Sequence, residues 1–246
     1  MINFLEIQTT MYSAEIPLLN SEEASIVIIG SFNPQIFHPE WFLKHELISS
    51  HDYDRENDKE SIFIHHDVAQ FELNSNIRIE VFKDRFVART PNRTDFNTLR
   101  DIVLGTFIIL GETPVIKMGM NYKCVTGQYS KERWKEFGAA FCHLNKLKKV
   151  YDHTKGEPLD NLNSFGLFSQ KILYPRNDDY NGAIFLDFSP NGPVPSRFLA
   201  FNVNSHIEFV NNDVDQVRNI LEKDWENSIN SSMFAIKKLI DLSKGS

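Results

Sequence analysis

The chain has 246 residues, of which 41% are hydrophobic and 24% charged, and a net charge of −7, a composition typical of a globular protein with a buried core. Its acidic excess disfavours a surface that coats nucleic acid or anionic lipid, because such a surface carries net positive charge. Its apolar runs are shorter than the roughly 18 residues of a membrane-spanning helix, so we expect no membrane association.

The cysteines indicate a reducing compartment. Cys124 and Cys142 are the only two, and they do not form the Cys-x-x-Cys pair of a thiolate metal site. The first residues lack the cationic start and the long apolar stretch of a signal peptide. Free thiols suit the cytoplasm, which we therefore predict as the location.

The N-terminal region predicts strands joined by polar turns. Residues 4–16 are expected to form an opening strand and residues 19–23 a polar turn. The β-branched run Ile26–Ile29 stops at Gly30, a pattern that predicts a strand buried on both faces. Apolar residues at helical spacing predict a short helix over residues 40–48.

The next segment predicts a loop followed by a hairpin. Residues 51–60 are the most polar stretch and are expected to form an exposed loop before a strand at 61–66. Apolar and polar residues alternate clearly over residues 77–83, which predicts another strand. Residues 83–85 then turn the chain into a strand at 86–88.

Two helices flank a further strand. Asp95 can cap a helix that runs to Leu110, and residues 115–125 are expected to form the strand. A second helix follows Ser130, whose hydroxyl can cap it, and continues to Leu147 with apolar residues every three or four positions.

The last third predicts strands and a long helix. Strands are expected at 165–174, 183–188 and 198–209, separated by Asn-Gly turns. One apolar stripe predicts a helix from about residue 213 to 240. Its length, unusual for a globular protein, leaves room for self-association through this helix.

The order of elements favours an α+β fold of antiparallel sheets packed against helices. Gly156 and Pro158 give the best candidate boundary. The chain then consists of an N-terminal half, 1–155, and a C-terminal half, 156–246, which are either two similar strands-then-helix units or one continuous domain.

The loop from Gly30 to His38 is the strongest candidate for a ligand site. Its Gly-Ser-Phe-Asn-Pro resembles the opening of adenylyltransferase-type nucleotidyltransferases, in which a His-x-Gly-His pair stabilises the nucleotide phosphates. The two histidine positions hold Ile36 and Pro39 here, so that chemistry is not expected. The candidate ligand-binding residues are Ser31, Asn33, His38 and Asn121.

His65, His66 and Asp67 combine residue types that bind metals. In a strand, neighbouring side chains point to opposite faces, so we expect that the two imidazoles do not share an ion. The sequence therefore predicts no metal, no cofactor and no catalytic residue.

Several short segments together are similar to one family. They are Gly30–Phe42, Lys83–Phe86, Pro114–Tyr122 with its Gly-x-Asn-Tyr ending, and the strands and long helix from Ala183 onward. They resemble a sporadically distributed, uncharacterised family of bacterial accessory proteins. The resemblance implies an α+β fold and a role in bacterial defence or toxin control, without an activity to transfer.

These observations lead to two functional hypotheses. The preferred one is a non-enzymatic protein that binds a protein partner, consistent with 12% aromatic residues and no polar catalytic set. The alternative is an enzyme that acts on a nucleotide or nucleic acid through the Gly30–His38 loop. A protein partner is thus expected, and nucleic acid is not.

Overall fold

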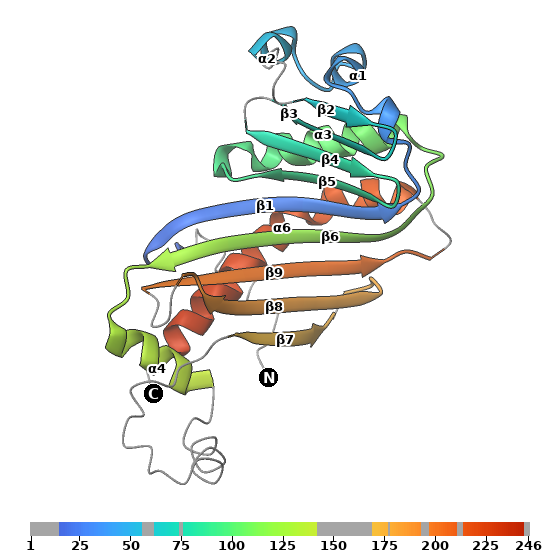
Figure 1. The fold of residues 1–246 in the computed structure, drawn as a ribbon. Coiled ribbons are helices and arrows are strands. Elements are labelled where there is room, and N and C mark those ends of the chain that lie inside the picture. Colours follow the sequence, from blue (N-terminus) through green and yellow to red (C-terminus); the bar gives the residue numbers. More distant parts are fainter. Residues whose placement is uncertain are drawn as a thin grey trace, which may run out of the picture.

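The computed structural model describes residues 15–55, 62–73, 76–141, 169–176, 178–192, 197–210 and 214–243. Nine antiparallel strands form one sheet, and two helices, α3 (Phe96–Ile109) and α6 (Val214–Leu242), lie behind it in Figure 1. The predicted α+β class, with an antiparallel sheet packed against helices, is confirmed.

The sheet has the order β2-β3-β4-β5-β1-β6-β9-β8-β7. Two antiparallel meanders therefore flank a central pair, and the predicted hairpin of β4 and β5 is confirmed. The strands are β1 (Leu19–Gly30), β2 (Phe63–His65), β3 (Val68–Leu73), β4 (Ile77–Phe82), β5 (Arg85–Thr90), β6 (Val115–Gly127), β7 (Gln170–Pro175), β8 (Gly182–Pro190) and β9 (Phe198–Glu208).

The shorter helices lie at the two ends of the sheet (Figure 1). Near β2 lie α1 (Pro39–Lys44) and α2 (Ser50–Arg55), and at the far end lies α4 (Lys131–Phe141). The 3-10 turns are η2 (Pro34–Ile36) and η3 (Arg93–Asp95). Within the described residues, no helix covers the front face of the sheet, which we call the open face.

The core lies between the sheet and α3 and α6. Because strand residues alternate between the two faces, Ile26 and Ile28 of β1 are fully buried under these helices. Val27 and Ile29 point to the open face and are only half-buried. The strand is confirmed, but the prediction that it is buried on both faces is wrong, because no described element covers its outer side.

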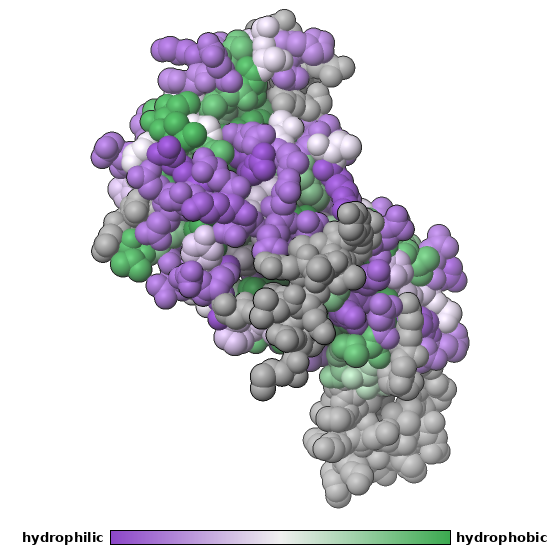
Figure 2. Space-filling view, turned by 180° about the vertical axis from the view of Figure 1, so that it is seen from behind, coloured by the Kyte–Doolittle hydropathy of each residue, from purple (hydrophilic) through white to green (hydrophobic). Residues whose placement is uncertain are grey.

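Helix α6 buries its apolar stripe inside its own chain. Its 29 residues span about 43 Å, and Trp225 at its middle is 1% exposed. Its exposed side chains are polar except Leu242, and the surface seen from this side is mainly hydrophilic, with separate apolar patches (Figure 2). Self-association through α6 stays a prediction. No helix in the described residues is both long and apolar enough to cross a bilayer.

Two polar segments depart from the predicted elements. Residues 19–23, expected to be a turn, form the first part of β1, where Glu23 pairs with Lys123 of β6. Residues 51–55, expected to belong to a loop, are part of α2. Polar side chains on an uncovered strand resemble a turn in sequence, because solvent accepts them in either structure.

Several predictions fall outside the described residues. They concern nearly all of the strand at 4–16, the end of the second helix, Cys142 and the proposed boundary at 155. Strands on both sides of that boundary nevertheless share the sheet, since β6 pairs with β9 from Lys117 opposite Glu208 to Gly127 opposite Phe198.

Candidate functional site

The open face presents rows of side chains that run across the strands. Register places Ser25, Asn121 and Asn204 opposite one another on β1, β6 and β9. The neighbouring row is more strongly charged. It contains Glu23, Lys123, Asn202 and Asp187, from β1, β6, β9 and β8.

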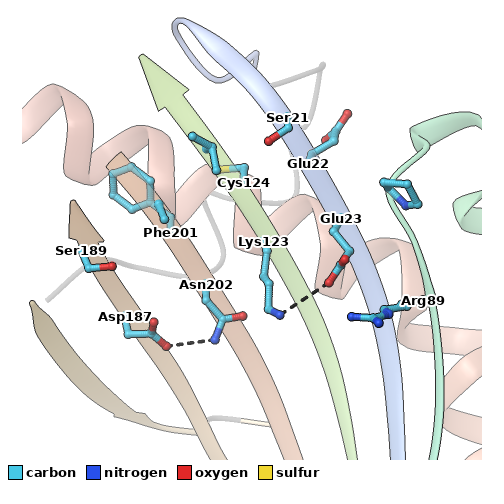
Figure 3. Close-up of a pocket in the computed structure, with 13 residues that line it drawn as sticks. Ser21, Glu22, Glu23, Arg89, Lys123, Cys124, Asp187, Ser189, Phe201 and Asn202 are labelled. Atoms are coloured by element: carbon cyan, nitrogen blue, oxygen red, sulfur yellow. Dashed lines mark hydrogen bonds and ion pairs between the residues drawn. The ribbon is translucent and has the colours of Figure 1, made fainter. Parts of the chain in front are cut away.

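A hollow of about 360 Å³ lies over the second row (Figure 3). We call it the polar hollow. In Figure 3, Lys123 and Glu23 approach each other from adjacent strands, and Asp187 and Asn202 do the same. Its lining also includes Ser21, Glu22, Arg89, Pro91, Cys124, Val125, Ser189, Ala200 and Phe201.

Ion pairs and hydrogen bonds engage several charged groups on this face. Lys123 Nζ lies 3.5 Å from Glu23 Oε1, and Asn202 Nδ2 donates to Asp187 Oδ2 over 2.9 Å. Arg89 donates to Glu80 Oε1 over 3.1 Å. Because Lys123 and Arg89 both lie against carboxylates, they do not form the cluster of unpaired cations that phosphate binding uses.

Two amide oxygens on the open face lack partners. Oδ1 of Asn202 and Oδ1 of Asn204 are buried and accept no hydrogen bond within the described residues. Gly119 leaves the space for the second amide, since a Cβ there would lie 3.0 Å from Asn204 Oδ1. An unpaired buried acceptor is costly, and a ligand donor would offset this cost only if the amide rotated to bring its oxygen to the surface.

On the helix-covered side of the same strands, a buried tyrosine joins β6 to β1. Tyr122 donates to Glu22 Oε2 over 2.6 Å, and Arg93 lies 3.8 Å from the same oxygen. Burial raises the pKa of Tyr122 and raises that of the neighbouring Cys124 to about 12. The Cys124 thiol is therefore protonated at neutral pH and is a poor nucleophile.

The structure places two of the predicted candidates in another hollow. Ser31 and Asn33 line a space of about 370 Å³ between the loop after β1 and the end of α3, with Ile109 and Pro114. We call it the loop hollow. Glu112 is the charged residue of its described lining, and a carboxylate repels phosphate.

The other two candidates lie elsewhere. His38 is not in the lining, and its Nδ1 accepts from the Glu40 amide over 3.2 Å as the cap of α1. Asn121 pairs with Ser25, whereas Gly30, where the loop begins, pairs with Val115. The five residues from Ser25 to Gly30 therefore place Asn121 about 17 Å from the loop along the strands. Asn121 instead belongs to the open face.

Sequence reasoning missed the charged members of the polar hollow. One signal was present, because polar residues alternate in β9 at Asn202, Asn204 and His206, the pattern of a strand with one solvated face. Which strands lie beside β9 could not be read from that alternation, so Lys123 and Asp187 could not be assigned to the same place.

No protein-family model matches this chain, and no curated protein matches it either. Any functional conclusion must therefore rest on the geometry of the sheet. The open face is the better candidate site, because its side chains converge from separate strands and are held by register.

Proposed function

We propose that this protein is a non-enzymatic binding protein that recognises a protein partner through the open face of its sheet. The observation that carries the proposal is a wide sheet surface with no described cover, on which Lys123 and Arg89 are paired with carboxylates. Bacterial defence or toxin control is the setting suggested by the family resemblance of its short motifs.

A protein suits this surface better than nucleic acid does. Nucleic acid binding depends on unpaired cations that displace counterions from phosphates, while the chain has a net charge of −7 and Lys123 and Arg89 face carboxylates. Protein interfaces instead combine polar groups of both signs with a small apolar centre. The open face offers both.

The apolar side chains that would form the centre of the interface lie on β7 and β8, at one side of the open face. Leu173 is 61% exposed and pairs directly with Phe185. Lys171 lies beside them, with Nζ 5.3 Å from the Phe185 ring centroid. Large apolar side chains surrounded by polar neighbours are typical of the residues that dominate the binding energy of interfaces.

Site-specific photo-crosslinking tests the proposed face. A photoreactive residue replaces Ser21 or Lys171 on the open face, or Glu226 on the exposed side of α6, in cells of the native host. We expect both open-face positions to give an adduct with the same protein, and the α6 position to give none. Adducts formed equally from α6 would contradict the proposal.

The captured protein is then purified and its affinity is measured by calorimetry. Leu173→Ala is expected to weaken binding at least about fivefold. Leu242→Ala is a matched control, because Leu242 is equally exposed, at 65%, but lies at the end of α6. Equal effects of the two changes would exclude the open face as the interface.

The alternative, an enzyme acting on nucleotides, has one supporting observation, the convergence of Ser31 and Asn33 in the loop hollow. Its volume is within the range of small-molecule pockets. If this alternative holds, nucleotides raise the melting temperature and Asn33→Ala abolishes the increase. An unchanged melting temperature across nucleotides, with and without divalent cations, leaves partner binding as the function.

A further inference from the structure

The turn between β2 and β3 brings two imidazoles together. His65 is the last residue of β2, and His66 lies beyond the strand end. The alternation that separates neighbouring strand side chains therefore does not apply to this pair. Their Nδ1 atoms lie 2.9 Å apart and their ring centroids 4.5 Å apart, so strand alternation gives no reason here against a shared ion.

Asp67 determines which nitrogen of His66 carries a lone pair. His66 Nε2 lies 2.7 Å from Asp67 Oδ2. Lys83 pairs with Oδ1 of the same carboxylate, and an ionised carboxylate can only accept hydrogen bonds. His66 therefore carries its proton on Nε2, and its Nδ1 directs a lone pair towards His65.

We propose that His65 and His66 bind a divalent transition-metal ion through their two Nδ1 atoms, with Asp67 as the positioning residue. Ligand atoms of the three residues lie within 4.8 Å of one another. The ion replaces the proton between the two Nδ1 atoms, and His65 then carries its proton on Nε2. Imidazole ligands suit Zn²⁺, Ni²⁺ and Cu²⁺.

The required movement is small. Two imidazoles in a tetrahedral zinc site, with Zn–N bonds of about 2.0–2.1 Å, have nitrogens about 3.3 Å apart. The observed 2.9 Å must increase by only about 0.4 Å. His65, His66 and Asp67 are exposed, so the ion has access and water can complete its coordination.

The Asp67 carboxylate, which lies against His66 Nε2, has a further role. A ligating histidine commonly donates its other N–H to a carboxylate, which fixes the tautomer and strengthens the ligand. Lys83 opposes the ion, because its ammonium group pairs with Oδ1 of Asp67 and adds positive charge nearby. Removing this charge should therefore tighten metal binding.

Calorimetry with Zn²⁺ on the untagged full chain at neutral pH tests the site. We expect one site in the wild type, binding at least tenfold weaker in His65→Ala and His66→Ala, and a loss of about 10- to 100-fold in Asp67→Asn. Lys83→Ala should bind more tightly. His51→Ala is the control, since His51 is exposed and lies outside the cluster, and it should leave the affinity unchanged.

Electron paramagnetic resonance of Cu²⁺ gives a readout that does not depend on affinity. The wild type should show coupling to two imidazole nitrogens, and His65→Ala to one. His65→Gln, which keeps a polar side chain, repeats the test if the alanine variant unfolds. Unchanged affinity in His65→Ala and His66→Ala, or an equal loss in His51→Ala, would overturn the proposed site.

Discussion

A close approach of the backbone explains the glycine at the end of β1. Gly30 donates to the Asp84 carbonyl over 3.1 Å, and the Ser31 amide donates to the Pro114 carbonyl over 3.0 Å. A Cβ at Gly30 would collide with that Pro114 oxygen. Sequence predicted that Gly30 ends the strand, but only the fold identifies the backbone that passes over it.

Gly30→Ala should therefore be destabilising. The new methyl group must displace backbone of another loop, which we expect to lower the free energy of unfolding by about 2 kcal/mol or more. Gly111→Ala is the matched control, because a Cβ there would meet only the Ile108 oxygen at 3.7 Å; its effect should stay within about 0.5 kcal/mol. Denaturant unfolding measures both, and equal losses would contradict the close-approach explanation.

At the scale of elements, the sequence predicted a helix or strand correctly where the pattern or cap that determines it lies within that same segment. The alternation in β4 and the Ser130 cap of α4 are examples, and the cap is observed as a hydrogen bond from the Arg133 amide to Ser130 Oγ over 3.1 Å. Residues 19–23 failed because Glu23 faces the open side and pairs with the distant Lys123. Nothing local distinguishes such a strand from a turn.

The candidate site was harder to predict for the same reason. Asn121 was singled out from its motif, and the structure places it on the open face. Glu23, Asn202 and Asp187 join it only because register brings β1, β6 and the β8–β9 pair together from distant parts of the sequence. Long-range pairing of this kind leaves no periodic signal within any one segment.

Arg133 connects two elements at the far end of the sheet. From α4 its guanidinium donates to the Ser243 carbonyl and the Ser243 hydroxyl, both over 2.7 Å, and to the Ile240 carbonyl over 3.3 Å. The last carbonyls of a helix lack intrahelical partners and attract cations. Arg133 therefore caps the C-terminus of α6.

Arg133→Ala should lower the free energy of unfolding by about 1–3 kcal/mol, because it removes the guanidinium donors to the Ser243 carbonyl and hydroxyl. Arg133→Lys should restore only part of this loss, since one ammonium cannot replace a planar guanidinium. Glu136→Ala is the control: it removes the 56% exposed partner of Arg133 and should cost at most about 1 kcal/mol. Chemical denaturation compares them. If Arg133→Ala cost as little as Glu136→Ala, the cap would contribute little to the free energy of unfolding.

At the scale of the molecule, the sheet and its helices join the two halves of the chain. The central strands β1 and β6 come from residues before 155, while β9 and α6, which pack on β6, come from residues after it. Trp225 of α6 is almost fully buried within this shared core. Separating the halves would expose the inner face of β6 and the apolar stripe of α6 to water.

We therefore expect the whole chain to unfold in one cooperative transition. Two variants that retain a single tryptophan, either Trp41 of α1 or Trp225 of α6, report on opposite halves of the sequence. Their fluorescence midpoints in denaturant should agree with each other and with the loss of far-ultraviolet circular dichroism. Separate midpoints would show that residues 1–155 and 156–246 are independent folding units. In that case the fragment 1–155 would also fold alone, although β6 would lose its pairing with β9.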